Sequence, residues 1–68
     1  MKQISGKEFC RILENHGWTL QRIKGSHHIY GIKGEENKIS VPVHSNKPLK
    51  SGLLCYFIKV AGLKEKDL

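Results

Sequence analysis

The first hydrophobic pattern along the chain is that of a short amphipathic helix. Three apolar side chains recur at helical spacing: Phe9, Ile12 and Leu13. Just before them, Ser5 and Glu8 have the spacing of a capping box, in which each side chain bonds the backbone amide of the other. His16 and Gly17 supply a stop signal. We therefore expect a helix over residues 6–16.

Three segments with the composition of β-strands follow, separated by turn residues. They are residues 18–24, 27–33 and 38–43. The third alternates strictly, with apolar side chains on one face at Ile39, Val41 and Val43. Pro42 cannot donate to a sheet ladder, so we expect this strand to end there or to form an edge. The short connections favour a three-stranded antiparallel meander.

A second helix is expected after Pro48, a residue that suits the first turn of a helix. A stripe of apolar residues at helical spacing follows, formed by Leu49, Leu53, Tyr56, Phe57 and Val60. Gly62 closes the helix with the residue preferred there. The predicted fold class is α+β, a single α-β-β-β-α domain over residues 1–68 with both helices on one face of the sheet.

The charge of the chain favours an acidic partner. Twelve Lys and Arg against six Asp and Glu give a net charge of +6. Nucleic acid is the first candidate and an acidic protein the second, while a protein that is merely basic stays a further alternative. The basic residues are dispersed, which indicates a folded surface and not a disordered tail.

The cysteines and the lack of long apolar segments indicate the cellular compartment of the protein. Cys10 and Cys55 have no metal-binding spacing, and we expect both to be reduced and mostly buried. Residues 1–5 are followed by no apolar run, so no signal peptide is expected, and no segment has the length of a membrane span. These features predict a cytoplasmic protein.

The candidate chemistry lies in residues 24–28, Lys-Gly-Ser-His-His, where a strand begins after a glycine turn. Histidine is suited to proton transfer near neutral pH, and RNA supplies its own nucleophile, the ribose 2′-hydroxyl. A base that accepts the proton of this hydroxyl and cations that stabilise the phosphate are sufficient for cleavage. No metal is therefore required in principle. His27 and His28 must point to opposite faces of the strand, and the pattern does not say which face is buried. A structural or merely exposed role stays open for either.

Neither a metal nor a cofactor is predicted. The four histidines lack a local ligand spacing, and the carboxylates lie away from the histidine pair in sequence.

Lysines at the start of the second helix form another candidate site. Lys47 and Lys50 flank Pro48, and the free amides of a helix N-terminus favour anions such as phosphate. A solvated helix end is the alternative. Arg22 and Lys24 on the strands are expected to contribute general electrostatic attraction. Among the aromatic residues, only Tyr30 is a candidate for base stacking, since the others are expected in the core.

Taken together, these segments resemble the HicA family of bacterial toxins, also described as YcfA-like mRNA interferases. The resemblance runs from end to end and is carried by residues 6–9, 16–18, 24–30, 41–44, 49–54 and 60–63. It implies a fold similar to the double-stranded RNA-binding domain. It also implies ribosome-independent cleavage of mRNA, inhibition of translation, and a HicB-type antitoxin as partner. The toxin is expected to be a monomer alone and a hetero-oligomer with its antitoxin.

The resemblance also implies one active histidine in the Gly-Ser-His segment. We place His28 slightly ahead of His27, on the argument that this lets Ile29 turn inward. Lys24 and Ser26 match the segment and are expected to bind phosphate, as are Arg22, Lys47 and Lys50. One histidine cannot easily be both base and acid in a turnover, so slow cleavage of low sequence specificity is expected. The alternative function is a non-catalytic double-stranded-RNA-binding module, and a weaker one is a module that docks an acidic protein.

Overall fold

The computed structural model describes residues 3–68. Met1 and Lys2 lie outside the described residues. They begin the predicted domain and the segment in which no signal peptide is expected. The elements are α1 (Gly6–Asn15), β1 (Thr19–Lys24), β2 (His27–Gly31), β3 (Ile39–Pro42), α2 (Ser51–Ala61) and a short 3-10 turn, η1 (Glu65–Asp67). The α-β-β-β-α order is confirmed, and only η1 was not expected.

Helix α1 begins where its capping box predicts. The Ser5 hydroxyl accepts from the Glu8 amide at 3.1 Å, and the Glu8 carboxylate accepts from the Ser5 amide at 3.2 Å. Two amides that would otherwise lack partners are thereby satisfied. The helix ends at Asn15, and Gly17 takes a left-handed conformation at φ 92°.

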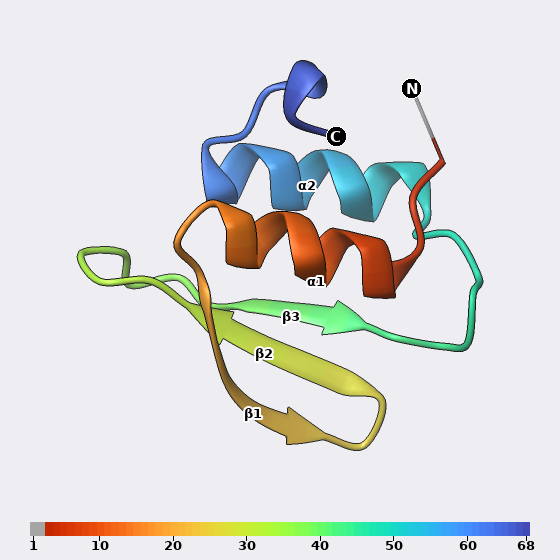
Figure 1. Cartoon of the computed structure of the whole chain (residues 1–68), viewed down its shortest axis with the longest axis horizontal. Helices are drawn as coiled ribbons and strands as arrows, with labels where there is room; N and C mark the ends of the chain where they lie inside the picture. Colours follow the sequence, from red (N-terminus) through yellow and green to blue (C-terminus); the bar gives the residue numbers. More distant parts are fainter. Residues whose placement is uncertain (1–2) are drawn as a thin grey trace.

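The three strands form the predicted antiparallel meander, in the order β1-β2-β3. In Figure 1 the two helices lie next to each other, above the sheet. The buried strand residues Tyr30, Ile39 and Val41 mark the face that packs against the helices. The pairing of Tyr30 with Ile39 sets the register, because cross-strand partners share a face. The opposite face of the sheet carries no helix and is called the open face below.

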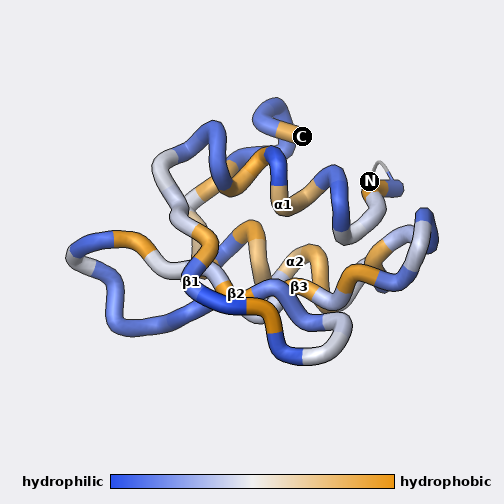
Figure 2. The backbone as a smooth tube through the Cα atoms, turned by 60° about the horizontal axis from the view of Figure 1, so that its bottom comes forward, coloured by the Kyte–Doolittle hydropathy of each residue, from blue (hydrophilic) through white to orange (hydrophobic). Residues whose placement is uncertain are grey.

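Only part of the stripe that the sequence indicated for the second helix is buried, namely Leu49 and Phe57. Leu54 and Phe57 are buried, whereas Leu53 is 36% and Tyr56 56% exposed. Figure 2 shows why periodicity misled: α2 is hydrophobic along most of its length, so more than one stripe has helical spacing. The inward face of α2 is therefore rotated from the predicted stripe, so that Leu54 is buried and the expectation that Tyr56 lies in the core is wrong.

The two cysteines have different surroundings. Cys10 is buried in the core, as expected, but Cys55 is exposed, and the expectation of a mostly buried thiol there is wrong. The reason is the same as for Tyr56: Cys55 lies on α2, whose apolar residues exceed what one inward face accommodates. Burial raises the pKa of the Cys10 thiol, and the hydrogen bond with Tyr30 offsets only part of that rise.

The start of α1, the end of β3 and the approach to α2 meet at one close junction. An added Cβ atom at Gly6 would lie 2.1 Å from the carbonyl oxygen of Pro42. On the other side, the Leu49 amide donates to the Ile4 carbonyl at 2.7 Å, and Ser5 forms an isolated bridge with Pro48. The chain entering α1 is thereby tied both to β3 and to the segment that leads into α2.

This junction predicts opposite effects for two helical glycines. Gly6→Ala forces its methyl group against backbone and should lower the free energy of unfolding by about 1–3 kcal/mol. Gly52→Ala, in the first turn of α2, meets open space and should be neutral or stabilising by up to about 1 kcal/mol. Urea denaturation of both variants provides the comparison; equal destabilisation would contradict the junction.

The cysteines should differ in reactivity in the folded protein. Iodoacetamide is expected to modify Cys55 quickly, since this side chain is exposed, and to leave Cys10 unmodified until denaturant is added. Peptide mass spectrometry after a time course measures both sites. Modification of Cys10 at the rate of Cys55 without denaturant would contradict the burial described.

Candidate nucleic-acid interface

The histidine pair begins β2, and its two side chains lie on different sides of the sheet. His28 pairs with Val41 and precedes Tyr30 by two residues, so it shares the helix side with these buried residues. His27 pairs with Lys24 and Pro42 and lies on the open face. His27 is exposed and His28 half-buried. Both imidazoles are therefore open to solvent, from opposite sides.

The structure contradicts the expectation that Ile29 turns inward, which was the argument for placing His28 ahead of His27. Ile29 lies on the open face, half-buried between its cross-strand partners Arg22 and Ser40. The inward side chain is that of Tyr30, since alternation places it on the helix side and its ring fills the core. A preference for His28 has to rest on its surroundings instead.

Tyr30 is also unavailable for base stacking. Its side chain is 1% exposed, and its hydroxyl donates to the Glu14 carboxylate at 2.7 Å. Burial, together with the hydrogen bond to this acceptor, raises the pKa of Tyr30. The exposed aromatic residue of the described chain is Tyr56, which the hydrophobic pattern had placed in the core.

The first group of predicted cations shares the open face with His27. Lys24 is the cross-strand partner of His27, and Arg22 lies two residues earlier on the same side of β1. All three side chains are exposed. A β-bulge at Gln21 shifts the register between Leu20 and Arg22 and so sets which β1 residues face outward. Within residues 3–68, Arg22 and Lys24 take part in no ion pair.

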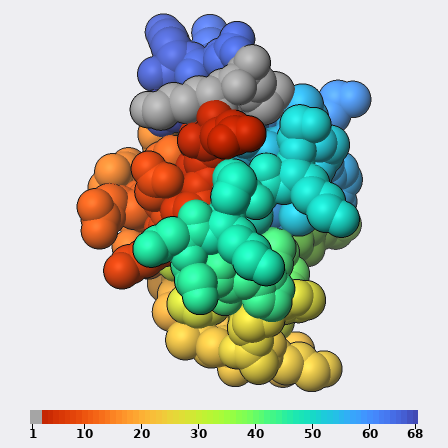
Figure 3. Space-filling model, turned by 90° about the vertical axis from the view of Figure 1, so that its right-hand side faces the viewer, coloured from red at the N-terminus to blue at the C-terminus, as the bar shows by residue number. Residues whose placement is uncertain are grey.

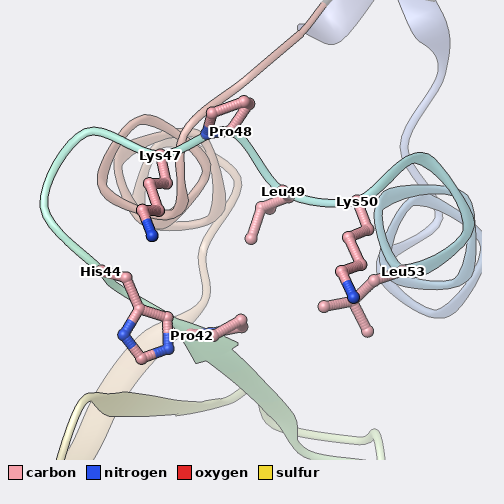
Figure 4. Close-up of a pocket in the computed structure, with 7 residues that line it drawn as sticks. All are labelled: Pro42, His44, Lys47, Pro48, Leu49, Lys50 and Leu53. Atoms are coloured by element: carbon pink, nitrogen blue, oxygen red, sulfur yellow. The ribbon is translucent and has the colours of Figure 1, made fainter.

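The second group lies at a pocket between the end of β3 and the start of α2 (Figure 4). The pocket has a volume of about 380 Å³ and is lined by Pro42, His44, Lys47, Pro48, Leu49, Lys50 and Leu53. In Figure 4 the Lys47 amine points toward the His44 ring, whereas the Lys50 amine lies beside Leu53. No carboxylate lines this pocket. The two lysines predicted from the sequence are therefore brought together, with a third nitrogen-bearing side chain.

His44 is the residue that the sequence interpretation left without a role. It follows β3 by two residues and begins a tight turn in which the Lys47 amide donates to its carbonyl at 3.1 Å. Ser45 takes a left-handed conformation within this turn, at φ 53°. The spacing of three residues between His44 and Lys47 was the available signal, but its meaning depends on a turn that the sequence did not reveal.

Ser26 connects the two groups through its backbone. It follows Gly25, which adopts a positive φ of 62°, and its carbonyl accepts from the Val43 amide at 2.8 Å. This bond fixes the β1–β2 turn beside the end of β3. In Figure 3, the segment after β3 (green) lies between the start of α2 (cyan) and the β1–β2 hairpin (yellow). The structure thus places the predicted site residues at one end of the sheet, with one group on the open face and the other at the pocket beside β3.

Across residues 3–68, no group of three or more His, Cys, Asp or Glu side chains gathers as a metal site requires. In the same part of the chain, neither helix has the length and apolar character needed to cross a membrane.

Comparison with models of protein families gives a match to most of the chain. A family model described as "HicA toxin of bacterial toxin-antitoxin" matches residues 6–63. The match includes both helices, all three strands and every residue of the two cationic groups. No curated protein matches the chain at a significant level.

Proposed function

The chain belongs to the HicA family of bacterial toxins, and from this premise we propose that it is an endoribonuclease that cleaves mRNA with one histidine of β2. The observation that carries the proposal is the position of His27 and His28, both open to solvent at the basic end of the sheet. An imidazole beside unpaired cations has the two components that RNA cleavage needs, a base and an electrostatic partner for the phosphate.

The proposed reaction uses the RNA's own hydroxyl group. The imidazole takes the proton of the ribose 2′-hydroxyl, and the 2′-oxygen attacks the adjacent phosphorus. The bond from phosphorus to the 5′-oxygen breaks, and that oxygen takes a proton from water or a lysine ammonium group. The products are a 2′,3′-cyclic phosphate and a free 5′-hydroxyl. Cations beside the phosphate stabilise the negative charge that develops on its oxygens.

We place His28 ahead of His27 as the base, because of what surrounds each. His28 is half-buried between its cross-strand partners Ile23 and Val41, which restrict the orientations of its ring. Its cross-strand partner Val41 directly precedes Pro42, which is in the wall of the pocket that Lys47 and Lys50 border. His27 on the open face would act with Lys24 and Arg22 instead.

Family membership implies an antitoxin partner. We propose that it is of the HicB type and that it inhibits the toxin by covering the β2 histidines and neutralising the cations around them. The toxin would then be a monomer when free and part of a hetero-oligomer when inhibited, with both components in the cytoplasm.

Substitution of each histidine should identify the base. His28→Ala is expected to lower the cleavage rate by about 10²–10⁴-fold, the usual contribution of a general base. His27→Ala should leave most of the activity, and cleavage by the unmodified chain should persist in EDTA. The measurement is gel analysis of a defined mRNA fragment, with circular dichroism to show that both variants fold. The opposite ranking would move the base to His27, and unchanged cleavage in the double variant would leave only RNA binding.

The cations at the pocket and those on the open face should differ in their effect on cleavage. If His28 is the base, Lys47→Ala and Lys50→Ala should each slow cleavage by about tenfold, as loss of a charge-assisted contact would. Lys24→Ala and Arg22→Ala should weaken RNA binding with a smaller effect on cleavage of bound RNA. Lys59→Ala, in the last turn of α2, is the matched control. Single-turnover rates at saturating RNA separate the two effects; equal effects of all five substitutions would contradict the division.

A further inference from the structure

The pocket between the end of β3 and the start of α2 has an apolar lining that the binding of a simple anion would not require. Its charged or titratable side chains are His44, Lys47 and Lys50, and the rest of its lining is apolar. We propose that this pocket binds one nucleotide unit of an RNA strand, with the phosphate on the two lysines, the sugar or base on the apolar lining, and His44 beside them. The proposal rests on RNA being the substrate and assigns a ligand contact to His44.

The charge of the lining calls for an anion. Lys47 and Lys50 form no ion pair within residues 3–68, and no carboxylate contributes to the pocket wall. Two like charges at one pocket repel each other, and a phosphate bound there offsets that repulsion. The imidazole of His44, toward which the Lys47 amine points in Figure 4, can donate a hydrogen bond to the same group.

The apolar lining distinguishes a nucleotide from a simple anion. Leu49 is 9% exposed and Leu53 36%, and Pro42 and Pro48 add two rigid rings. Inorganic phosphate gains nothing from these surfaces, whereas the faces of a base or ribose lose water on contact with them. The volume of about 380 Å³ is near the lower end for small-molecule sites, and it suits a single unit of the strand.

The walls of the pocket are fixed by backbone contacts. The Leu49 amide donates to the Ile4 carbonyl at 2.7 Å, and the Leu54 amide donates to the Lys50 carbonyl at 2.9 Å. The Lys47 amide bonds the His44 carbonyl, which closes the turn between them. A cavity held in this way exists before the ligand arrives, so binding does not have to order the loop.

The position of the pocket identifies which nucleotide it would bind. Pro42 in its wall is the cross-strand partner of His27, and the preceding residue, Val41, is the partner of His28. Partner Cα atoms in an antiparallel pair are about 4.5–5.5 Å apart. The pocket is therefore close to the histidine pair but not at it, which fits a nucleotide that flanks the cleaved bond.

The test is an NMR titration of the isotope-labelled chain with three probes: uridine 5′-monophosphate, inorganic phosphate and a short glutamate-containing peptide. The mononucleotide has no internucleotide bond to cleave, so its binding is measured whether or not the chain is a ribonuclease. We expect its shifts to centre on His44, Lys47 and Leu53, and its affinity to exceed that of phosphate.

Two substitutions separate the charge from the apolar lining. Lys50→Ala should weaken both the mononucleotide and phosphate, by about tenfold for the mononucleotide. Leu53→Ser, at a partly exposed position that tolerates a smaller side chain, should weaken the mononucleotide by about threefold and leave phosphate unchanged. Lys59→Ala and Tyr56→Ser, on α2 outside the pocket, are the matched controls and should change neither affinity.

Three results would overturn the proposal. Equal affinities for phosphate and the mononucleotide, or equal effects of Leu53→Ser on both, would indicate an anion site without nucleotide recognition. Binding of the acidic peptide alone would identify a protein-docking surface. Absence of shifts around the pocket with every probe would show that it is no ligand site. A chain that binds the mononucleotide as expected yet cleaves no RNA would sustain this inference and contradict only the ribonuclease proposal.

Discussion

The contact between Gly6 and the carbonyl of Pro42 is the constraint on which the functional end of the molecule depends. A side chain at position 6 would separate α1 from the end of β3, because its Cβ atom would meet backbone at 2.1 Å. The same junction holds the approach to α2 through the bond from the Leu49 amide to the Ile4 carbonyl. In a chain this small, few other contacts fix the ends of these elements. The pocket and the histidine pair both border this junction.

The alternation of side chains along β2 then divides the candidate chemistry. Tyr30 is committed to the core by its buried ring and its hydrogen bond to Glu14. Its direction puts His28 on the helix side and His27 on the open face, where Lys24 is the cross-strand partner of His27. Adjacent histidines that look equivalent in the sequence therefore belong to two separate surfaces.

Local signals in the sequence were sufficient for most of the fold and for part of the site. The capping box at Ser5 and the alternation around Val41 depend on neighbouring residues alone, and the structure confirms the helix and strand they predict. Periodicity failed on α2, where apolar residues all round the helix left the inward face undetermined, so Tyr56 was placed in the core. His44 was missed because its place beside Lys47 depends on a turn and on the packing of α2, both of which are long-range consequences of the fold.

The central claim is that a β2 histidine takes the proton of a ribose 2′-hydroxyl, and removal of that hydroxyl tests it most directly. Two RNAs of the same sequence, one unmodified and one with 2′-O-methyl groups at every position, would be incubated with the chain and their ends analysed by mass spectrometry. We expect 2′,3′-cyclic phosphate ends from the unmodified RNA and no cleavage of the methylated one, with similar binding of both. Cleavage of the methylated RNA would contradict it, because the nucleophile would then come from elsewhere.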